Sequence, residues 1–72
     1  MKVIYENNIL ILSDEDRKDL FTIGDEINLS LKSTYSTSGI ILAIEETENT
    51  LIIQDKNSEV HVGFNIIKDW AC

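Results

Sequence analysis

The residues that could carry chemistry are concentrated at the carboxyl end of the sequence. The single histidine (His61), tryptophan (Trp70) and cysteine (Cys72) all lie in EVHVGFNIIKDWAC, residues 59–72. A catalytic histidine needs a carboxylate and a nucleophile held beside it, and no nucleophile motif frames His61. One cysteine and one histidine also fall short of the four ligands of a structural zinc site. We therefore expect no catalytic residue, no metal site and no cofactor, and interpret this segment as the closing edge of a small core.

A surface histidine can tune partner binding near neutral pH, because the ordinary pKa of histidine lies close to that range. We therefore include His61 among the candidate partner-binding residues. Tyr35, in the polar loop STYSTS, is a second candidate, since exposed tyrosine offers contact area at low entropic cost. The alternative for Tyr35 is that it folds back and covers the core.

Glu45, Glu46 and Glu48 are the remaining candidates for partner binding, and they lie in the turn between two apolar runs. A calcium loop needs alternating oxygen ligands and a glycine at the sharp bend, and this turn has no such glycine. We interpret it as a solvated tip that meets a protein partner rather than a cation.

These candidate residues must be positioned by short β-strands, because the apolar residues occur in short runs and alternating patterns that are typical of a β protein. Residues 2–6 and 9–12 flank Asn7-Asn8, which predicts a hairpin because asparagine tolerates the positive φ of a tight turn. The alternation in EINLSLK predicts a half-buried strand at residues 26–32. Further strands are expected at residues 39–45, 50–55 and 59–62, with a last strand or helical turn at residues 65–70.

One short helix is expected between the hairpin and the next strand. Ser13 can cap free N–H groups, and the acids that follow it suit the positive end of a helix dipole. The helix would extend through Leu20 and Phe21, which would plug one end of the core, and Gly24 would end it or form the next turn.

The resulting prediction is a single domain, residues 1–72, that is mainly β: a small antiparallel barrel of five to six strands with one short helix. The start of the chain does not resemble a signal peptide, and no apolar run approaches the roughly 20 residues of a spanning helix. A lone cysteine suits a reducing compartment. We therefore expect a soluble, cytoplasmic protein that does not enter membranes.

Residues 24–70 carry the order GD-x-I-x-L, polar loop, SGI-x-L-A-I, turn, strand, VHV-x-F-x-x-I. This order resembles the small SH3-like and Sm-like barrels, in which a bent five-stranded sheet ends in a short turn and a last strand. The tail SGIILAIEETENTLIIQDKNSEVHVGFNIIKDW is also similar to the end of the YolD-like bacterial proteins. The resemblances imply an SH3-like or Sm-like barrel and a bacterial or phage setting.

ILILS at residues 9–13, followed by IGDEI at residues 23–27, resembles the opening of the carbon storage regulator family of RNA-binding dimers. Asp14 occupies the position of that family's basic residue after the serine, and Phe64 the position of its RNA-reading arginine. The resemblance implies an RNA-binding alternative in which both charged contacts are missing.

The net charge of the protein limits the classes of partner that it can bind. Thirteen acidic against six basic residues give a net charge of −7, which repels phosphate backbones and makes nucleic acid a poor partner. We expect a non-enzymatic protein-binding module, a small acidic regulator or accessory protein. A chain this short buries little surface, so we also expect a homo-oligomer, with the apolar strand at residues 40–44 as its interface. The alternatives are an acidic inhibitor, immunity or nucleic-acid-mimic protein with a basic target, and an Sm-like or carbon-storage-type RNA-binding protein.

Overall fold

The computed structural model describes residues 1–71, and nearly all of them lie in strands or tight turns. The elements are β1 (Lys2–Glu6), β2 (Ile9–Ser13), β3 (Lys18–Thr22), β4 (Glu26–Leu31), β5 (Ser36–Glu45), β6 (Thr50–Asp55), β7 (Ser58–Gly63), the 3₁₀ turn η1 (Phe64–Ile66) and β8 (Ile67–Ala71). The prediction of a mainly β protein is confirmed, but residues 1–71 form eight strands rather than the five to six expected, because the segment expected to be a helix is also a strand and the first hairpin belongs to a separate sheet. Within residues 1–71 no helix is long and apolar enough to cross a membrane.

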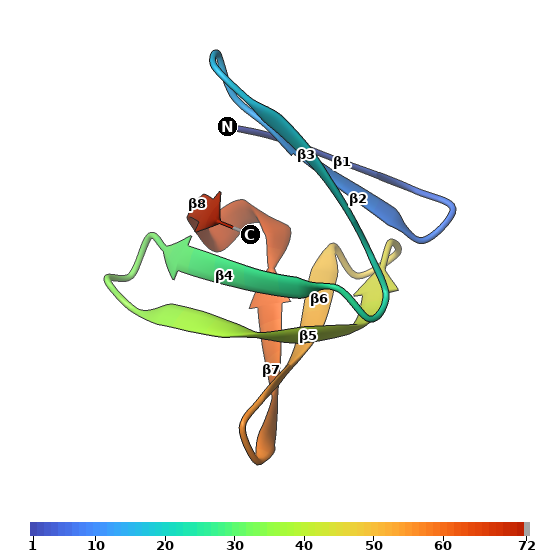
Figure 1. Cartoon of the computed structure of the whole chain (residues 1–72), viewed down its shortest axis with the longest axis vertical. Coiled ribbons are helices and arrows are strands. Elements are labelled where there is room, and N and C mark those ends of the chain that lie inside the picture. Colours follow the sequence, from blue (N-terminus) through green and yellow to red (C-terminus); the bar gives the residue numbers. More distant parts are fainter. Residues whose placement is uncertain (72) are drawn as a thin grey trace.

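The strands form two antiparallel sheets. β1, β2 and β3 make a three-stranded meander, and the other five strands make a sheet in the order β7-β6-β5-β4-β8. In the larger sheet β4 to β7 follow one another, and β8 returns after η1 to pair with the free side of β4. Figure 1 shows the three-stranded sheet lying above the five-stranded sheet, with β8 between them on one side.

The predicted hairpin at the start of the chain is confirmed. Asn7 and Asn8 both have positive φ, 52° and 65°, as a two-residue turn with φ > 0 at both positions requires. The turn fixes the register in which Glu6 faces Ile9, and the pairing continues to Lys2 and Ser13. Local turn chemistry therefore specifies the first two strands.

The predicted helix at residues 13–21 is wrong. The Asp14 carboxylate accepts hydrogen bonds from the backbone N–H groups of Asp16 (2.9 Å) and Arg17 (3.1 Å), which is how a helix-capping side chain acts. Here the bonds close a turn instead, since the Asp14 N–H donates to the Arg17 carbonyl at 2.9 Å. The chain then enters β3, where Phe21 is buried and Leu20 is exposed. Phe21 therefore reaches the core as predicted, but from a strand, and Leu20 does not.

Two β-bulges explain why buried residues lie three positions apart in β5 and β8, a spacing that would put them on opposite faces of a regular strand. Ile41 and Ile44 are both buried although they are three residues apart, and the pairing of β5 with β6 shifts between Ile41 and Ala43. The extra residue lets both isoleucines point inward and bends the strand. In β8 the same spacing separates Ile67 and Trp70, and the β4–β8 register shifts there too. The two bulges curve the five-stranded sheet around its core.

Gly39 allows the sharpest approach between two strands. A Cβ atom at this position would lie 1.9 Å from the Gln54 carbonyl oxygen on β6. Glycine in a strand interior often marks such a close backbone approach. The strand expected at residues 39–45 is confirmed, but β5 begins three residues earlier, at Ser36, so Gly39 lies within the strand rather than at its start.

The core draws on both sheets. Inward-facing side chains from the meander pack in one cluster with those of the five-stranded sheet; the buried members are Leu10, Leu12, Phe21, Ile27, Leu29, Ile41, Ile44, Leu51, Ile53, Val62, Phe64, Ile67 and Trp70. Trp70 is only 3% exposed, so the tryptophan closes the core as expected, whereas Ile66 beside it is 38% exposed. Cys72 lies outside the described residues.

Candidate functional site

A groove of about 700 Å³ lies between the edge strand β1 and the segment that leads from β7 into β8. Its lining combines apolar, amide and charged side chains from distant parts of the chain: Met1, Val3, Tyr5, Lys32, Glu48, Asn49, Gly63, Phe64, Asn65, Ile67 and Lys68. Binding sites are usually concave, and they combine apolar side chains with polar groups that orient the ligand. We define these residues as the β1 groove.

Tyr5 closes one end of the β1 groove against the larger sheet. Its ring packs against Phe64, with 4.7 Å between the centroids and 34° between the planes. The Tyr5 hydroxyl donates a hydrogen bond to the Asn49 Oδ1 atom, across 44 positions of sequence. Asn49 is held in place because its carbonyl accepts the Phe64 N–H at 2.9 Å. These contacts make a rigid aromatic and amide wall.

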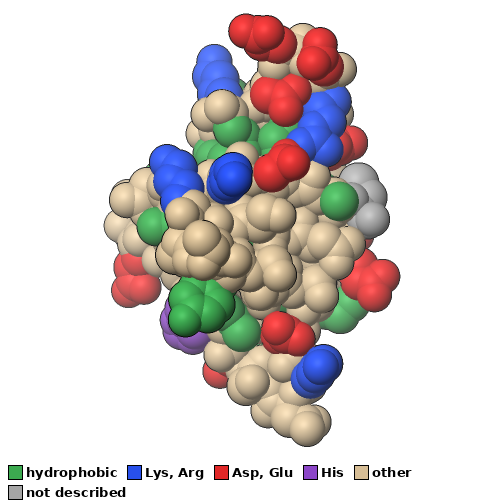
Figure 2. Space-filling view, turned by 90° about the vertical axis from the view of Figure 1, so that its left-hand side faces the viewer, with side chains coloured by type: hydrophobic (Ala, Val, Ile, Leu, Met, Phe, Trp, Pro, Cys, Tyr) green, Lys and Arg blue, Asp and Glu red, His purple; other side chains and the backbone are tan. Residues whose placement is uncertain are grey.

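Lys32 and Lys68 bring positive charge to the β4–β8 side of the β1 groove. Leu31 pairs with Ile67, and the Lys32 N–H donates to the Ile66 carbonyl at 2.8 Å, so both lysines lie beside this junction. Both are exposed, and they stand out in a chain of net charge −7. Figure 2 shows Lys and Arg side chains gathered in the upper half of one face of the molecule.

The free edge of β1 lies along this groove. Glu6 and Ile9 flank a two-residue turn, so they form a hydrogen-bonded pair of the ladder. The ladder then alternates, which directs the N–H and C=O groups of Val3 and Tyr5 away from β2. Within residues 1–71 no backbone hydrogen bond joins this edge to another segment. An unpaired edge next to a groove can accept a further strand.

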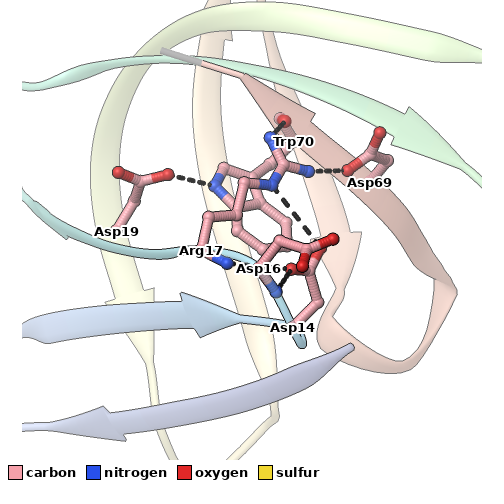
Figure 3. A network of polar contacts seen from close by, with 6 residues as sticks. All are labelled: Asp14, Asp16, Arg17, Asp19, Asp69 and Trp70. Atoms are coloured by element: carbon pink, nitrogen blue, oxygen red, sulfur yellow. Dashed lines mark hydrogen bonds and ion pairs between the residues drawn. The ribbon is translucent and has the colours of Figure 1, made fainter.

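Arg17, in the β2–β3 loop, joins the two sheets (Figure 3). Its guanidinium carbon lies 3.8 Å from the centroid of the Trp70 ring, and Nη1 donates to the Trp70 carbonyl at 2.9 Å. Nη2 forms an ion pair with Asp69, and Nε lies 3.5 Å from Asp14 Oδ2. The Arg17 cluster therefore ties the β2–β3 loop to β8.

Asp14 and Asp19 complete the Arg17 cluster. The backbone N–H of Asp16 is the main cause that lowers the pKa of Asp14 below its ordinary value of 3.8, and Arg17 lowers it further. On the far side of the ring, Trp70 Nε1 donates to Asp19 Oδ2 at 2.8 Å. These bonds satisfy both the carbonyl and the indole N–H of the tryptophan, so the cluster holds the β2–β3 loop and β3 against β8.

A smaller polar groove of about 360 Å³ lies where β4, β5 and β8 meet the β6–β7 turn. Thr37 is its only buried polar side chain among residues 1–71, and its hydroxyl donates to Asp55 Oδ2 at 3.0 Å. The internal bond leaves the threonine satisfied. Among residues 1–71 no group of three or more His, Cys, Asp or Glu side chains is placed to hold a metal ion.

The predicted partner-binding residues do not form one site. Tyr35 lies in the turn before β5 and is 74% exposed, so it does not fold back over the core. Glu45 ends β5, and Glu46 and Glu48 lie in the turn after it, at the opposite end of this strand. His61 is exposed on β7. Of these five residues only Glu48 lines the β1 groove.

Most of the groove escaped prediction. The alternation of Val3 and Tyr5 in the first strand was a usable signal, since it places both on the face that packs toward the core. The isolated tyrosine of a five-residue strand could therefore have been singled out. Nothing local in the sequence pairs Tyr5 with Asn49 or Lys32 with Lys68.

No protein-family model matches the chain, and neither a curated protein nor a solved structure matches it.

Proposed function

We propose that this chain is a non-enzymatic protein-binding module whose β1 groove holds an extended segment of a partner protein. The observation that carries the proposal is the coincidence of the groove with the unpaired edge of β1. An added strand gains main-chain hydrogen bonds from such an edge, and pockets for alternate side chains give it specificity. The peptide groups of Val3 and Tyr5 supply the edge, and the side chains of the same two residues line the pocket.

The lining indicates the chemistry of the partner segment. Met1 and Val3 favour apolar side chains at the positions that point inward. Lys32 and Lys68 favour a carboxylate at the β4–β8 side, because exposed ammonium groups attract acidic partners and steer their approach. The expected ligand is an extended peptide in which an apolar residue alternates with neighbours that include an acid.

We further propose that the five-stranded sheet is an SH3-like or Sm-like barrel. The return of β8 to pair with β4 after the single 3₁₀ turn η1 supports this, because those families end in a short turn and a last strand. The bulges near Ile41 and Ser30 support it as well, since they curve the sheet. The three-stranded meander is then an addition that supplies one wall of the β1 groove.

An RNA-binding role is less well supported by this groove. Binding to single-stranded RNA relies on aromatic faces on which bases stack. Phe64 is only 6% exposed, and Tyr5 packs its ring against Phe64 rather than offering a free face. Glu48 in the lining also repels phosphate. A protein ligand suits the groove better.

An acidic inhibitor is a second proposal, and it uses a different surface. Glu15 and Asp16, which are adjacent in the β2–β3 loop, are exposed. A basic target would meet these carboxylates, and its affinity would fall steeply with salt. Binding in the β1 groove, in contrast, combines apolar burial with two charges and loses less affinity as salt is added.

A displayed library of random linear peptides tests the main proposal. Selection against the purified protein is expected to enrich peptides with alternating apolar residues and at least one acid. Affinity is then measured by fluorescence anisotropy with a synthetic peptide from the selection. Lys32→Glu and Lys68→Glu are each expected to weaken binding about tenfold. Lys56→Glu makes the same charge change in the β6–β7 turn, away from the groove, and is expected to leave affinity unchanged.

The edge is tested separately with Val3→Pro. Proline is tolerated on an edge strand where the lost N–H points outward, so the fold is expected to survive. Peptide binding is expected to be lost, because the added strand loses a backbone donor. Selection of no peptide, equal binding by all three lysine variants, or full affinity in folded Val3→Pro would each contradict the proposal. A gel shift with single-stranded RNA at low salt tests the RNA alternative.

A further inference from the structure

The outer face of the three-stranded sheet is unusually apolar for a surface. The strand register places Ile4, Ile11 and Leu20 in one row across β1, β2 and β3. Leu20 is 58% exposed and Ile4 is 39% exposed, and Ile9 in the next row is half-buried. These four residues form the meander face. A contiguous apolar patch on a small protein commonly marks an interaction surface.

No segment of residues 1–71 covers the meander face. The inner side of the same sheet, with Leu10, Leu12 and Phe21, already packs against the rest of the core. Figure 1 shows the five-stranded sheet on that inner side alone. The face must therefore be covered by another molecule or stay in water.

The charges at the two ends of the face are opposite in sign. Lys2 and Lys18 lie in one row, on either side of Ser13, at the end near the β2–β3 loop. Glu6 and Thr22 lie in the row at the other end. The Asp25 carboxylate joins that end, because it accepts the Thr22 N–H at 2.8 Å. Two lysines therefore stand at one end of the meander face and two carboxylates at the other.

We propose that two copies of this chain associate through their meander faces, related by a twofold axis that lies in the interface and perpendicular to the strands. This axis reverses the strand direction between the copies, so the lysine end of each lies over the carboxylate end of the other. It brings Ile11 of both copies close to the axis and the apolar rows together. An axis parallel to the strands would instead oppose lysine to lysine.

The dimer leaves the proposed peptide-binding groove open. The groove uses Val3 and Tyr5, whose side chains point to the inner side of β1, whereas the dimer uses Ile4 and Glu6 on the outer side. Glu15 and Asp16 extend past the face, opposite the neutral asparagine turn of the other copy. Three strands of five residues offer less than the roughly 800 Å² per partner of a standard interface, so we expect a dissociation constant in the micromolar range.

Sedimentation velocity on the full chain, from low micromolar to several hundred micromolar, tests this inference. The wild type is expected to change from monomer to dimer over that range. Leu20→Thr and Ile4→Thr each place a β-branched, polar residue at an exposed strand position, and each is expected to raise the dissociation constant about tenfold or more. Leu42→Thr makes the same kind of change on the outer face of β5, where this leucine is 37% exposed, and is expected to leave the dimer intact.

Charge reversal tests the direction of the axis. The double variant Lys2→Glu/Lys18→Glu and the single variant Glu6→Lys are each expected to be monomeric alone, and to form a mixed dimer when combined. With an axis parallel to the strands, neither variant would lose self-association. A wild type that stays monomeric, a dimer that survives both Leu20→Thr and Ile4→Thr, or one that Leu42→Thr abolishes would overturn the proposal. Circular dichroism on each variant confirms that it is folded.

Discussion

The Arg17 guanidinium lies over the Trp70 ring, 3.8 Å from its centroid, and joins the β2–β3 loop to the last described strand. Fifty-three positions of sequence separate the two residues. Arginine suits this place because its planar fork stacks on the ring while its N–H groups reach the Trp70 carbonyl and the Asp69 carboxylate. Lysine has the charge but not the shape.

Arg17→Lys is expected to lower the free energy of unfolding by about 1–2 kcal/mol, through loss of the stacked contact and of a charge-assisted hydrogen bond. Urea denaturation measures this. In a double-mutant cycle with Trp70→Phe, the two changes are expected to be less than additive, because each removes the same contact. If the two changes lower the free energy of unfolding additively, the stacking of Arg17 on Trp70 does not contribute to stability.

Gly39→Ala is expected to cost about 3 kcal/mol or to prevent folding, because the new methyl group would overlap the Gln54 carbonyl oxygen and neither backbone can yield. Gly63→Ala is the matched control. There the Cβ would lie 3.0 Å from the Asn65 side chain, which is exposed and can rotate away. We expect the control to change thermal stability little. Equal tolerance of both changes would be inconsistent with the described β5–β6 approach.

Thr34→Gly is expected to stabilise the protein. Thr34 has φ 73° in the β4–β5 turn, a conformation that costs a β-branched residue about 1–3 kcal/mol. Glycine removes that strain at an entropic cost of about 0.5–1 kcal/mol, so the melting temperature should rise by a few degrees. Thr47→Gly, in a turn position without positive φ, is expected to lower it. A fall in both variants would refute the strain at Thr34.

Asp14 predicts a component of acid unfolding. The pKa of Asp14 is lowered in the folded state, so its ionised form stabilises the fold above the ordinary value of 3.8, and this contribution is lost as pH falls through 3.8 toward the folded pKa. Asp14→Asn keeps an oxygen that can accept the turn N–H bonds. It is expected to reduce stability at pH 6 and to flatten the loss of stability below pH 4. Melting curves from pH 2 to pH 6 measure the slope, with Glu15→Gln as the control from the same loop.

Strand periodicity and turn chemistry made part of this fold predictable. Asn7 and Asn8 identified the first hairpin, and the alternation at Ile27 and Leu29 identified β4. β3 was missed because Ser13 followed by three acids matches a helix start, whereas the Asp14 carboxylate in fact accepts the N–H groups of Asp16 and Arg17 in a turn. Leu20 and Phe21, the apolar residues that follow, are adjacent, so their spacing shows neither the period of 3.6 residues of a helix nor the period of two of a strand.

The β1 groove lay beyond prediction because tertiary contacts assemble it. Tyr5, Asn49 and Phe64 meet only after the meander packs on the larger sheet. Lys32 and Lys68 meet only through the β4–β8 pairing. Candidate residues chosen for rarity or loop position, such as His61 and Tyr35, remain predictions to be tested by mutation.

The late return of β8 has a consequence for how the protein is made. A ribosome adds about 5–20 residues per second, so β4 is synthesised about 2–8 seconds before β8. During that interval the edge of β4 is unpaired and the hydrophobic core is open at one end. The Arg17 guanidinium has no tryptophan ring on which to stack. Nascent chains stalled before the final strand should therefore recruit chaperones or be cut by proteases, and resistance should appear only once the tryptophan has emerged.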